Sequence, residues 1–488
     1  MASSSTLAFT PIEEIDRIHA RLHAGFKTGT LKSLGKRQDQ LLQLAYMLKE
    51  NQSAFEEALA KDLGRPKLET NFLEVAPLIN EAVKTIKDVP KWAAPEKPPF
   101  NINFFAMKPV IRKEAKGVVL IIAPFNYPYF LTIGPLIGAI AAGNACVVKP
   151  SELTPTCSQL MADLFPKYLD PDLYAVVNGA IPETTRLLEL KWDHILYTGN
   201  SRVAKIVAKA AAERLTPVSL ELGGKSPVFV DPNCDLKMTA RRLLWGKVAN
   251  AGQTCVAPDY VLVPREFQDT LVKALEDTYK DFYPEGPAKS DSFSRIVSGN
   301  HFNRIKKLLD GTQGQVVLGG DTNEGDRYIA PTVVKNVPTS DSLMSDEIFG
   351  PLLPIVPVKD LDEAIAFVNS GDHPLALYVF SNDAKTKKKV FDSTQSGAAC
   401  ANELIIHIGA EGLPFGGIGP SGTGYHTGKF TFDMFTHLRA SIDSPGWIDM
   451  ILNFRFPPYT AKKERALARM FPTKLPRRDA YSSAKSQC

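Results

Sequence analysis

The amino-acid sequence predicts an α/β protein with a parallel sheet and a second α/β domain. Three observations support this prediction. From residue 117 onward, short apolar runs alternate with segments of helical periodicity, which is the pattern of repeated strand–helix–strand units. A second run of the same kind begins at residues 226–231. The length of 488 residues exceeds what one hydrophobic core usually serves, so two or more domains are expected.

The N-terminal part is expected to be helical. Leucine and alanine recur at helical spacing between residues 41 and 48, and helices are predicted within residues 11–63. Residues 95–109 are rich in proline and aromatic side chains and have little helical periodicity. This segment is therefore expected to leave the main body of the protein and return to it.

The first α/β run begins with a continuous apolar strand at residues 117–123, followed by a small-residue helix that ends near Gly143. Open parallel sheets of this kind commonly bind nucleotides at the carboxyl ends of their strands. The remaining elements are expected in this order: strand 145–149, helix 155–168, strand 173–177, helix 183–190, strand 194–197, helix 202–213 and strand 218–220.

The second α/β run is expected to start with a strand at residues 226–231. A helix at 236–250 and a strand at 260–263 follow it, and Cys255 falls in the loop between these two elements. Loops on a rigid scaffold are the usual place for catalytic residues.

Composition and charge argue against several classes of protein. The net charge of +4 is small for this length, so a role in binding nucleic acid is not expected. The charge is uneven, because residues 455–488 hold nine Lys/Arg and two Asp/Glu and form a basic tail. The apolar stretch 130–148 is interrupted by glycine and proline, which suits a buried helix better than a membrane span.

The six cysteines are scattered, without a C-x-x-C pair or a histidine pair at metal spacing. Neither a metal site nor a disulfide framework is therefore expected. The first residues have no charged segment followed by an apolar core, so a secretory signal is not expected either. A reducing, cytoplasmic location follows from these features.

Two glycine-bearing segments carry the first chemical hypothesis. Cys255 follows Gly252-Gln253-Thr254, and Glu221 lies 34 positions upstream, before Leu222-Gly223-Gly224-Lys225. A thiol nucleophile with a carboxylate base suggests covalent catalysis through a thioester. A single cysteine is more often a small buried hydrophobe, so neither motif alone would carry this hypothesis.

A third segment, Pro124-Phe125-Asn126-Tyr127-Pro128, follows the first predicted strand. At the carboxyl end of a strand, the Asn126 amide can donate a hydrogen bond to a developing oxyanion. The alternative is that Asn126 only shapes the turn between two prolines.

Five motifs in this chain resemble, in order and spacing, those of the aldehyde dehydrogenase superfamily between about residues 10 and 458. Residues 124–128 and 453–459, and the absence of a long segment before the first helices, resemble class 3, the branch that includes the fatty aldehyde dehydrogenases. Within this branch the sequence is most similar to fungal members. The five motifs are Asn126, 221–225, 252–255, 347–351 and 414–417.

The resemblance implies a Rossmann-type NAD-binding domain, a second α/β catalytic domain, a small β element for bridging and oligomerisation, and a C-terminal gating segment with the basic tail. A homodimer is the family's usual assembly. The expected boundaries are 1–94 and 116–222 for the NAD-binding domain and 223–425 for the catalytic domain. The β element is expected at 95–115 and 426–446, and the C-terminal segment at 447–488.

The resemblance also assigns residues to the cofactor. Lys149 is expected at the adenosine ribose and Glu152 near its 2′ position, where a carboxylate favours NAD over NADP. Without the resemblance, Glu152 would be interpreted as part of a helix cap. The turn that opens the next helix is expected to receive the pyrophosphate. Its residues are Thr198, Gly199, Asn200, Ser201 and Ala204, the last standing where the family usually has a second glycine; Leu222, Gly223, Glu347 and Phe349 complete the expected cofactor site.

The reaction implied is oxidation of an aldehyde to a carboxylic acid. Cys255 attacks the carbonyl, the Asn126 amide and the Cys255 N–H stabilise the oxyanion, and hydride passes to NAD, or to NADP as the alternative. Glu221 then activates water to hydrolyse the thioester. Lys225 is expected to be structural.

Rival interpretations are a cysteine hydrolase or acyltransferase without nicotinamide, a non-catalytic binding protein, and a dehydrogenase that passes the acyl group to coenzyme A. Medium- to long-chain fatty aldehydes are the preferred substrates, with an apocarotenal or an aromatic aldehyde as alternatives. The basic tail suits either peripheral binding to the cytosolic face of an intracellular membrane or a solvated chain end.

Overall fold

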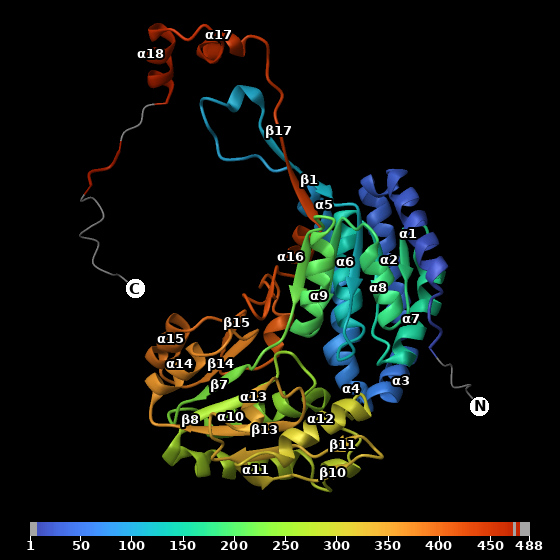
Figure 1. The fold of residues 1–488 in the computed structure, drawn as a ribbon, viewed down its shortest axis with the longest axis vertical. Coiled ribbons are helices and arrows are strands. Elements are labelled where there is room, and N and C mark those ends of the chain that lie inside the picture. The colour runs from blue at the N-terminus through green and yellow to red at the C-terminus, as the bar shows by residue number, and fades with distance from the viewer. Residues whose placement is uncertain (1–6, 472–474, 479–488) are drawn as a thin grey trace. The chain divides into compact units, whose positions relative to one another are not determined.

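The protein is described from a computed structural model, which covers residues 7–471 and 475–478. The chain forms two compact units. The larger unit is built from residues up to Trp92 and from Ala115 to His437, and the smaller from Ala93–Glu114 and the residues from Leu438 onward. The larger unit contains two sheets (Figure 1).

The first sheet has six strands in the order β16-β6-β5-β2-β3-β4. Five of them are parallel, and the two-residue β16 joins the edge in antiparallel fashion. β2 and β3 are apolar and buried throughout, as expected for strands covered on both faces. The strands are β2 (Val118–Ile122), β3 (Ala145–Lys149), β4 (Tyr174–Val176), β5 (His194–Thr198), β6 (Val218–Glu221) and β16 (Gly422–Thr423).

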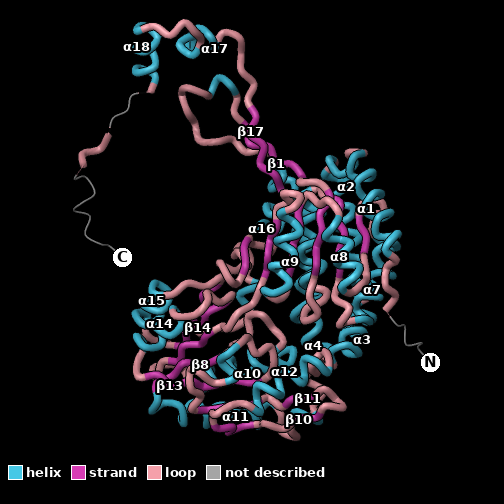
Figure 2. The backbone as a smooth tube through the Cα atoms, viewed as in Figure 1, coloured by secondary structure: helices cyan, strands magenta, loops and turns pink. Residues whose placement is uncertain are grey.

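Helices flank this sheet (Figure 2). α6 packs on β2 and β3, and its sequence is almost entirely apolar because nearly every position is buried. Between α4 and α5 the chain forms a π-helical turn at Asn71–Val75. The helices of this part are α1 (Ile12–Lys27), α2 (Leu34–Glu50), α3 (Gln52–Leu63), α4 (Lys67–Thr70), α5 (Ala76–Ala93), α6 (Phe130–Ala142), α7 (Pro155–Tyr168), α8 (Ile181–Glu189), α9 (Ser201–Ala212) and α16 (Lys429–Met434).

The second sheet has seven strands in the order β15-β14-β7-β8-β13-β12-β9, and only β9 runs antiparallel to its neighbour. A short hairpin, β10–β11, lies between β9 and β12 in the sequence. The strands are β7 (Pro227–Val230), β8 (Tyr260–Pro264), β9 (Gln315–Leu318), β10 (Thr322–Asn323), β11 (Tyr328–Ile329), β12 (Thr332–Lys335), β13 (Leu352–Val358), β14 (Ala376–Phe380) and β15 (Ala398–Ala401).

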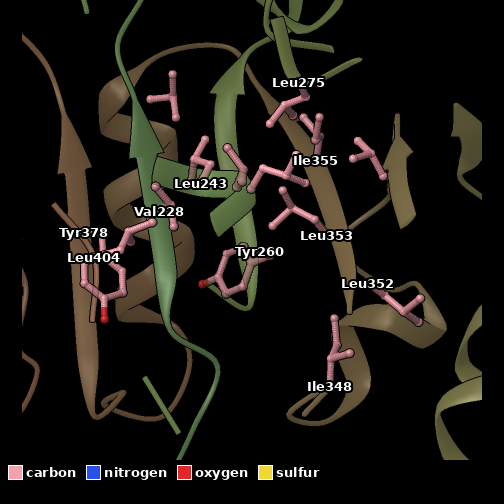
Figure 3. Close-up of a cluster of buried hydrophobic side chains, with 14 of the residues drawn as sticks. Val228, Leu243, Tyr260, Leu275, Ile348, Leu352, Leu353, Ile355, Tyr378 and Leu404 are labelled. Carbon is pink, nitrogen blue, oxygen red and sulfur yellow. The ribbon is translucent and has the colours of Figure 1, made fainter. Parts of the chain in front are cut away.

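Side chains from the central strands and from the flanking helices form one continuous core around the second sheet (Figure 3). Val228, Leu243, Leu275, Ile355 and Tyr378 are among its fully buried members. This core gives the loops at the strand ends a rigid support. The helices of this part are α10 (Leu236–Val248), α11 (Gln268–Phe282), α12 (Gly299–Asp310), α13 (Ser342–Ser345), α14 (Leu361–Asn369) and α15 (Ala384–Ser393).

The smaller unit contains a two-stranded sheet of β1 (Val110–Ala115) and β17 (Thr436–Ser441). Two helices follow, α17 (Ile448–Leu452) and α18 (Ala461–Met470). Met107 forms a small apolar cluster with Ile448 and Leu452. Among the residues that the structure describes, no helix is both long and apolar enough to cross a membrane.

The fold class predicted from the sequence is confirmed, because the larger unit is an α/β structure with two largely parallel sheets. The division into cofactor, catalytic, bridging and tail segments stays a prediction. One edge strand of the first sheet, β16 (Gly422–Thr423), lies far downstream of the other five, which end at Glu221.

Candidate active site

Asn126 lies in the loop between β2 and α6, at the carboxyl end of a central strand. The residue is buried, and its main-chain carbonyl accepts hydrogen bonds from Arg65 and from Asn250. Among the described residues, its side-chain amide has no hydrogen-bond partner, so the N–H donors of that amide are free for a ligand. The predicted position of this residue at a strand end is therefore what the structure shows.

Glu221 is the last residue of β6, and β16 places Gly422 opposite it. Its buried Oε2 lies 3.5 Å from Nε2 of His426, while Oε1 has no hydrogen-bond partner among the described residues. Burial raises the pKa of Glu221, and the neighbouring His426 opposes this rise. A carboxylate in this environment is a stronger base than one in water, which suits the activation of a water molecule.

Cys255 lies in the loop between α10 and β8, which begins with a tight turn at Ala249–Gly252. Gly252 has a φ of 74°, and a Cβ added there would lie 2.3 Å from the carbonyl oxygen of Gly350, so glycine is required. Burial raises the pKa of the Cys255 thiol, and the carboxylates of Glu221 and Glu347 raise it further. The thiol is therefore protonated at neutral pH and needs a nearby base to become a nucleophile.

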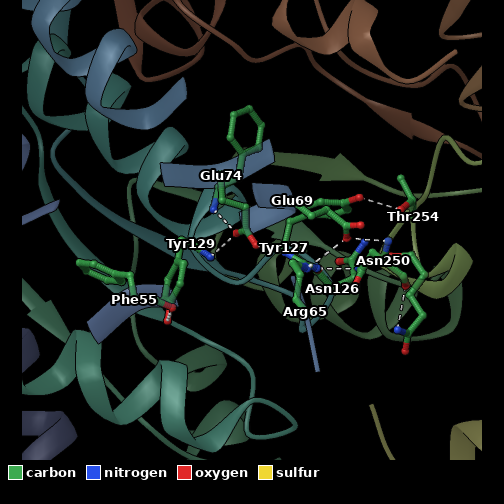
Figure 4. A network of polar contacts seen from close by, with 11 residues as sticks. Phe55, Arg65, Glu69, Glu74, Asn126, Tyr127, Tyr129, Asn250 and Thr254 are labelled. Carbon is green, nitrogen blue, oxygen red and sulfur yellow. Dashed lines mark hydrogen bonds and ion pairs between the residues drawn. The ribbon is translucent and has the colours of Figure 1, made fainter. Parts of the chain in front are cut away.

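The loops that carry Asn126 and Cys255 are joined by direct hydrogen bonds (Figure 4). The hydroxyl groups of Tyr127 and Thr254 lie 2.8 Å apart, and the Asn250 amide donates to the Asn126 carbonyl at 2.9 Å. The Glu221 carboxylate also raises the pKa of the Cys255 thiol, so the electrostatic field of Glu221 reaches the nucleophile.

The residues predicted for the adenosine ribose lie at the end of β3. Lys149 is buried, and its Nζ lies 3.0 Å from Oε2 of Glu152, whose side chain remains partly exposed. An ion pair at the carboxyl end of a parallel strand can receive ribose hydroxyl groups on both its cation and its anion.

The turn after β5 contains the residues predicted for the pyrophosphate. Thr198 ends the strand, and Asn200 caps α9 by accepting a hydrogen bond from the Val203 N–H at 3.0 Å. Ser201 is exposed in the first turn of the helix, whereas Ala204 is buried. Gly199 allows close packing, since a Cβ there would lie 2.4 Å from the Tyr197 hydroxyl oxygen. A helix of this length presents free N–H groups to an anion.

The remaining residues predicted for the cofactor lie after β6 (Leu222 and Gly223) and before β13 (Glu347 and Phe349). Leu222 is buried, and a Cβ on Gly223 would lie 2.4 Å from Oε1 of Glu347. Burial and Asp259 raise the pKa of Glu347 to about 8, and its Oε1 is a buried acceptor without a partner among the described residues. Phe349 has a φ of 49° and packs edge-on against Phe125 at 5.9 Å between ring centroids.

The donor and acceptor set at these positions fits a nicotinamide dinucleotide. The unpaired oxygen of Glu347 is suited to accept from a ribose hydroxyl, and Gly223 leaves room beside it. Lys225 holds this region in place, since its Nζ donates to the carbonyls of Leu343 and Asp346 at 2.9 Å each.

Comparison with known proteins identifies the family. The model of the aldehyde dehydrogenase family matches residues 6–441. The chain belongs to the aldehyde dehydrogenase family. It is 44% identical to rat aldehyde dehydrogenase family 3 member A2 over 449 residues, which are 92% of each chain.

Two further relatives extend the comparison. This aldehyde dehydrogenase is 45% identical to the rat aldehyde dehydrogenase named dimeric and NADP-preferring, over 91% of this chain and 98% of the relative. The solved substrate-bound AldH of Staphylococcus aureus is 39% identical, with a TM-score of 0.91 over 94% of this chain and 99% of that chain. The predicted resemblance to class 3 is confirmed by these matches, whereas the similarity to fungal members stays a prediction.

The chain is therefore an NAD(P)-dependent enzyme that oxidises aldehydes to carboxylic acids. The rival interpretations, a cysteine hydrolase without nicotinamide and a non-catalytic binding protein, are not favoured. The individual roles predicted for Cys255, Glu221, Asn126 and the cofactor residues remain proposals that the geometry supports.

Sequence reasoning missed several residues that contact the predicted ones. His426 beside Glu221, and Arg65 and Asn250 beside Asn126, carry no motif that marks them. Asn250 lies five residues before Cys255, and that proximity was the one available signal.

Proposed function

We propose that this aldehyde dehydrogenase uses Cys255 as nucleophile, Glu221 as general base and Asn126 as oxyanion donor. The convergence of a thiol, a buried carboxylate and an unpaired amide supports these roles. Glu221, whose pKa is raised, takes a proton from the water that attacks the thioester, and the Asn126 amide and the Cys255 N–H stabilise the oxyanion. The dinucleotide supplies the hydride acceptor when bound.

Absorbance at 340 nm tests the reaction directly. Purified protein with NAD and an aliphatic aldehyde is expected to form NADH and the carboxylic acid in equal amounts. Formation of the acid without NADH would contradict the assignment.

We infer that the substrates are apolar aldehydes of medium to long chain, with apocarotenals or aromatic aldehydes as the alternatives. A cavity of about 640 Å³ lies beside α10, the helix that leads to the Cys255 loop. Phe72, Met238, Trp245, Phe282 and Ile406 supply the apolar part of its lining, and the charged part comes from Asp235, Lys237, Arg241, Arg242 and Glu403. We propose that the apolar side chains contact the aliphatic chain and that the charged side chains stand at the solvent side of the cavity.

Replacing Trp245 with alanine is expected to lower kcat/KM for hexadecanal by about tenfold, because apolar contact with the distal chain is lost. For hexanal the change should stay below about twofold. Initial rates across aldehydes of six to sixteen carbons, with an apocarotenal and benzaldehyde included, measure both values. An equal loss for short and long aldehydes would place the aliphatic chain elsewhere.

We propose a preference for NAD, because the Glu152 carboxylate beside Lys149 would repel a 2′-phosphate. The relative named NADP-preferring argues instead for NADP. Glu152→Gln is therefore expected to raise kcat/KM for NADP by about tenfold relative to NAD, since one like charge is removed. Steady-state rates with each cofactor measure this ratio, and an unchanged ratio would exclude Glu152 as its determinant.

Removing His426 is expected to change the pH dependence of acyl-enzyme hydrolysis. His426 holds down the pKa of Glu221 against the effect of burial, and Glu221 acts as a base only when ionised. His426→Gln should therefore move the acidic limb of hydrolysis to higher pH. The rate of p-nitrophenyl acetate hydrolysis between pH 5 and 9 measures this limb, and an unshifted profile would contradict the pairing.

We also propose a homodimer, since one relative is named dimeric. Light scattering tests this proposal, and a monomer would contradict it.

For the C-terminal segment we propose peripheral attachment to anionic membranes on the cytosolic side. Lys462, Arg465 and Arg469 on α18 are exposed, as are Trp447 and Met450 near α17. Sedimentation with phosphatidylserine vesicles tests the attachment. Protein that stays in the supernatant at low salt would contradict it.

A further inference from the structure

Arg65 is a fully buried cation in the segment between α3 and α4. Its Nη1 donates to Glu74, its Nη2 donates to the main-chain carbonyl of Asn126, and its guanidinium lies 4.8 Å from the centroid of the Tyr127 ring. Burying a charge is costly unless it is paired, and Glu74 supplies the pairing. The hydrogen bond from Nη2 therefore holds Arg65 to the main-chain carbonyl of Asn126, the residue proposed as oxyanion donor.

Glu74 fixes the other side of the same loop. It lies in the π-helical turn Asn71–Val75, and its Oε2 accepts hydrogen bonds from the N–H groups of Tyr129 at 2.8 Å and Phe130 at 2.9 Å. Arg65 and Glu74 together hold both ends of the segment from Asn126 to the start of α6 (Figure 4). π-helical turns occur frequently at functional sites.

Asn250 connects this cluster with the loop of the nucleophile. Its side-chain amide donates to the carbonyls of Asn126 at 2.9 Å and Gln253 at 3.0 Å, and its main-chain N–H donates to Oε1 of Glu69 at 2.7 Å. Asn250 and Ala251 both have a φ of 52°, a left-handed conformation that is uncommon outside glycine. The contact with Glu69 therefore holds a left-handed backbone four to five residues before Cys255.

We propose that Arg65 and Asn250 are positioning residues that act through the Asn126 carbonyl. By fixing this carbonyl from two elements, they set the distance between the Asn126 amide and the Cys255 N–H, the two donors proposed for the oxyanion. This inference rests on the proposed role of Asn126. Misplacing such a donor by about 1 Å can cost about a hundredfold in rate.

The choice of arginine follows from its geometry. Its planar guanidinium serves the Glu74 carboxylate and the Asn126 carbonyl with separate nitrogens, whereas the single ammonium of lysine is a point charge. Arg65→Lys keeps the charge beside Glu74 and Glu69 and removes the fixed fork. Asn250→Gly keeps a left-handed backbone accessible and removes the amide.

The experiment compares Arg65→Lys, Asn126→Ala and the double variant in the full-length enzyme. Arg65→Lys is expected to lower kcat by about 10- to 100-fold while KM changes less than about threefold. In the Asn126→Ala background the same change should cost less than about threefold, because the donor that it positions is already gone. Asn250→Gly is expected to behave in the same way, and it replaces Arg65→Lys if that variant does not fold.

Arg37→Lys is the matched control. Arg37 is also buried and donates to the carbonyls of Leu31 and Ala141, away from the site, so its replacement should leave kcat within about twofold. The proposal is overturned if Arg65→Lys retains wild-type kcat or loses the same factor in both backgrounds. If Asn126→Ala alone leaves kcat unchanged, the proposed role of Asn126 fails, and the single variant shows this separately.

Discussion

Serine in place of Cys255 is expected to lower kcat for aldehyde oxidation by at least about 10⁴-fold, because the reaction loses its nucleophile. Burial and two carboxylates raise the pKa of the thiol, and an alcohol in the same place would be harder still to ionise. NADH formation at 340 nm measures the loss, and intact-mass spectrometry shows whether an acyl group is trapped on the protein.

Cys400→Ser is the control for this prediction, because Cys400 is also only partly buried but lies on β15. It should keep wild-type activity and acyl labelling. A Cys255→Ser variant that keeps more than about one hundredth of the wild-type kcat would contradict the role of Cys255.

Glutamine in place of Glu221 is expected to stop turnover after one hydride transfer per active site, with the thioester left on the enzyme. The amide keeps the shape of the side chain but cannot take a proton from water, so hydrolysis of the thioester should slow by about 10²- to 10⁴-fold. Rapid mixing should show a burst of about one NADH per site, followed by almost no further product. The quenched protein should carry the mass of the acyl group.

The double variant Cys255→Ser with Glu221→Gln should show neither burst nor added mass, which links the adduct to the thiol. A Glu221→Gln enzyme without a burst would mean that Glu221 is needed before hydride transfer, to ionise Cys255. That outcome would reassign the carboxylate to the first step.

Much of the fold could be predicted because it depends on local patterns. The continuous apolar run at 118–122 and the helix at 155–168 lie within a residue or two of their predicted bounds. β16 could not be predicted, since two residues carry no periodicity and pair with a strand distant in the sequence. The hairpin β10–β11 was not predicted either, because each of its strands has only two residues.

The site divides in the same way. Cys255 follows a glycine-bearing turn between α10 and β8, and Glu221 ends β6 directly before a glycine pair, so both stand in local sequence patterns that can be recognised. Arg65 and His426 act through contacts with residues distant in the sequence, such as Asn126, which lies 61 positions from Arg65. A single sequence does not show which ionisable side chains become buried beside residues distant in the chain, as Arg65 and His426 do.

The late strand β16 also bears on how the protein is made. Because Glu221 pairs with Gly422, the ribosome must complete more than four-fifths of the 488-residue polypeptide before this edge of the first sheet can close. Until then β6 presents unpaired backbone groups, a state that invites association with other nascent chains. Premature termination before residue 422 would therefore yield a product with an open sheet edge and an incomplete surrounding for the carboxylate.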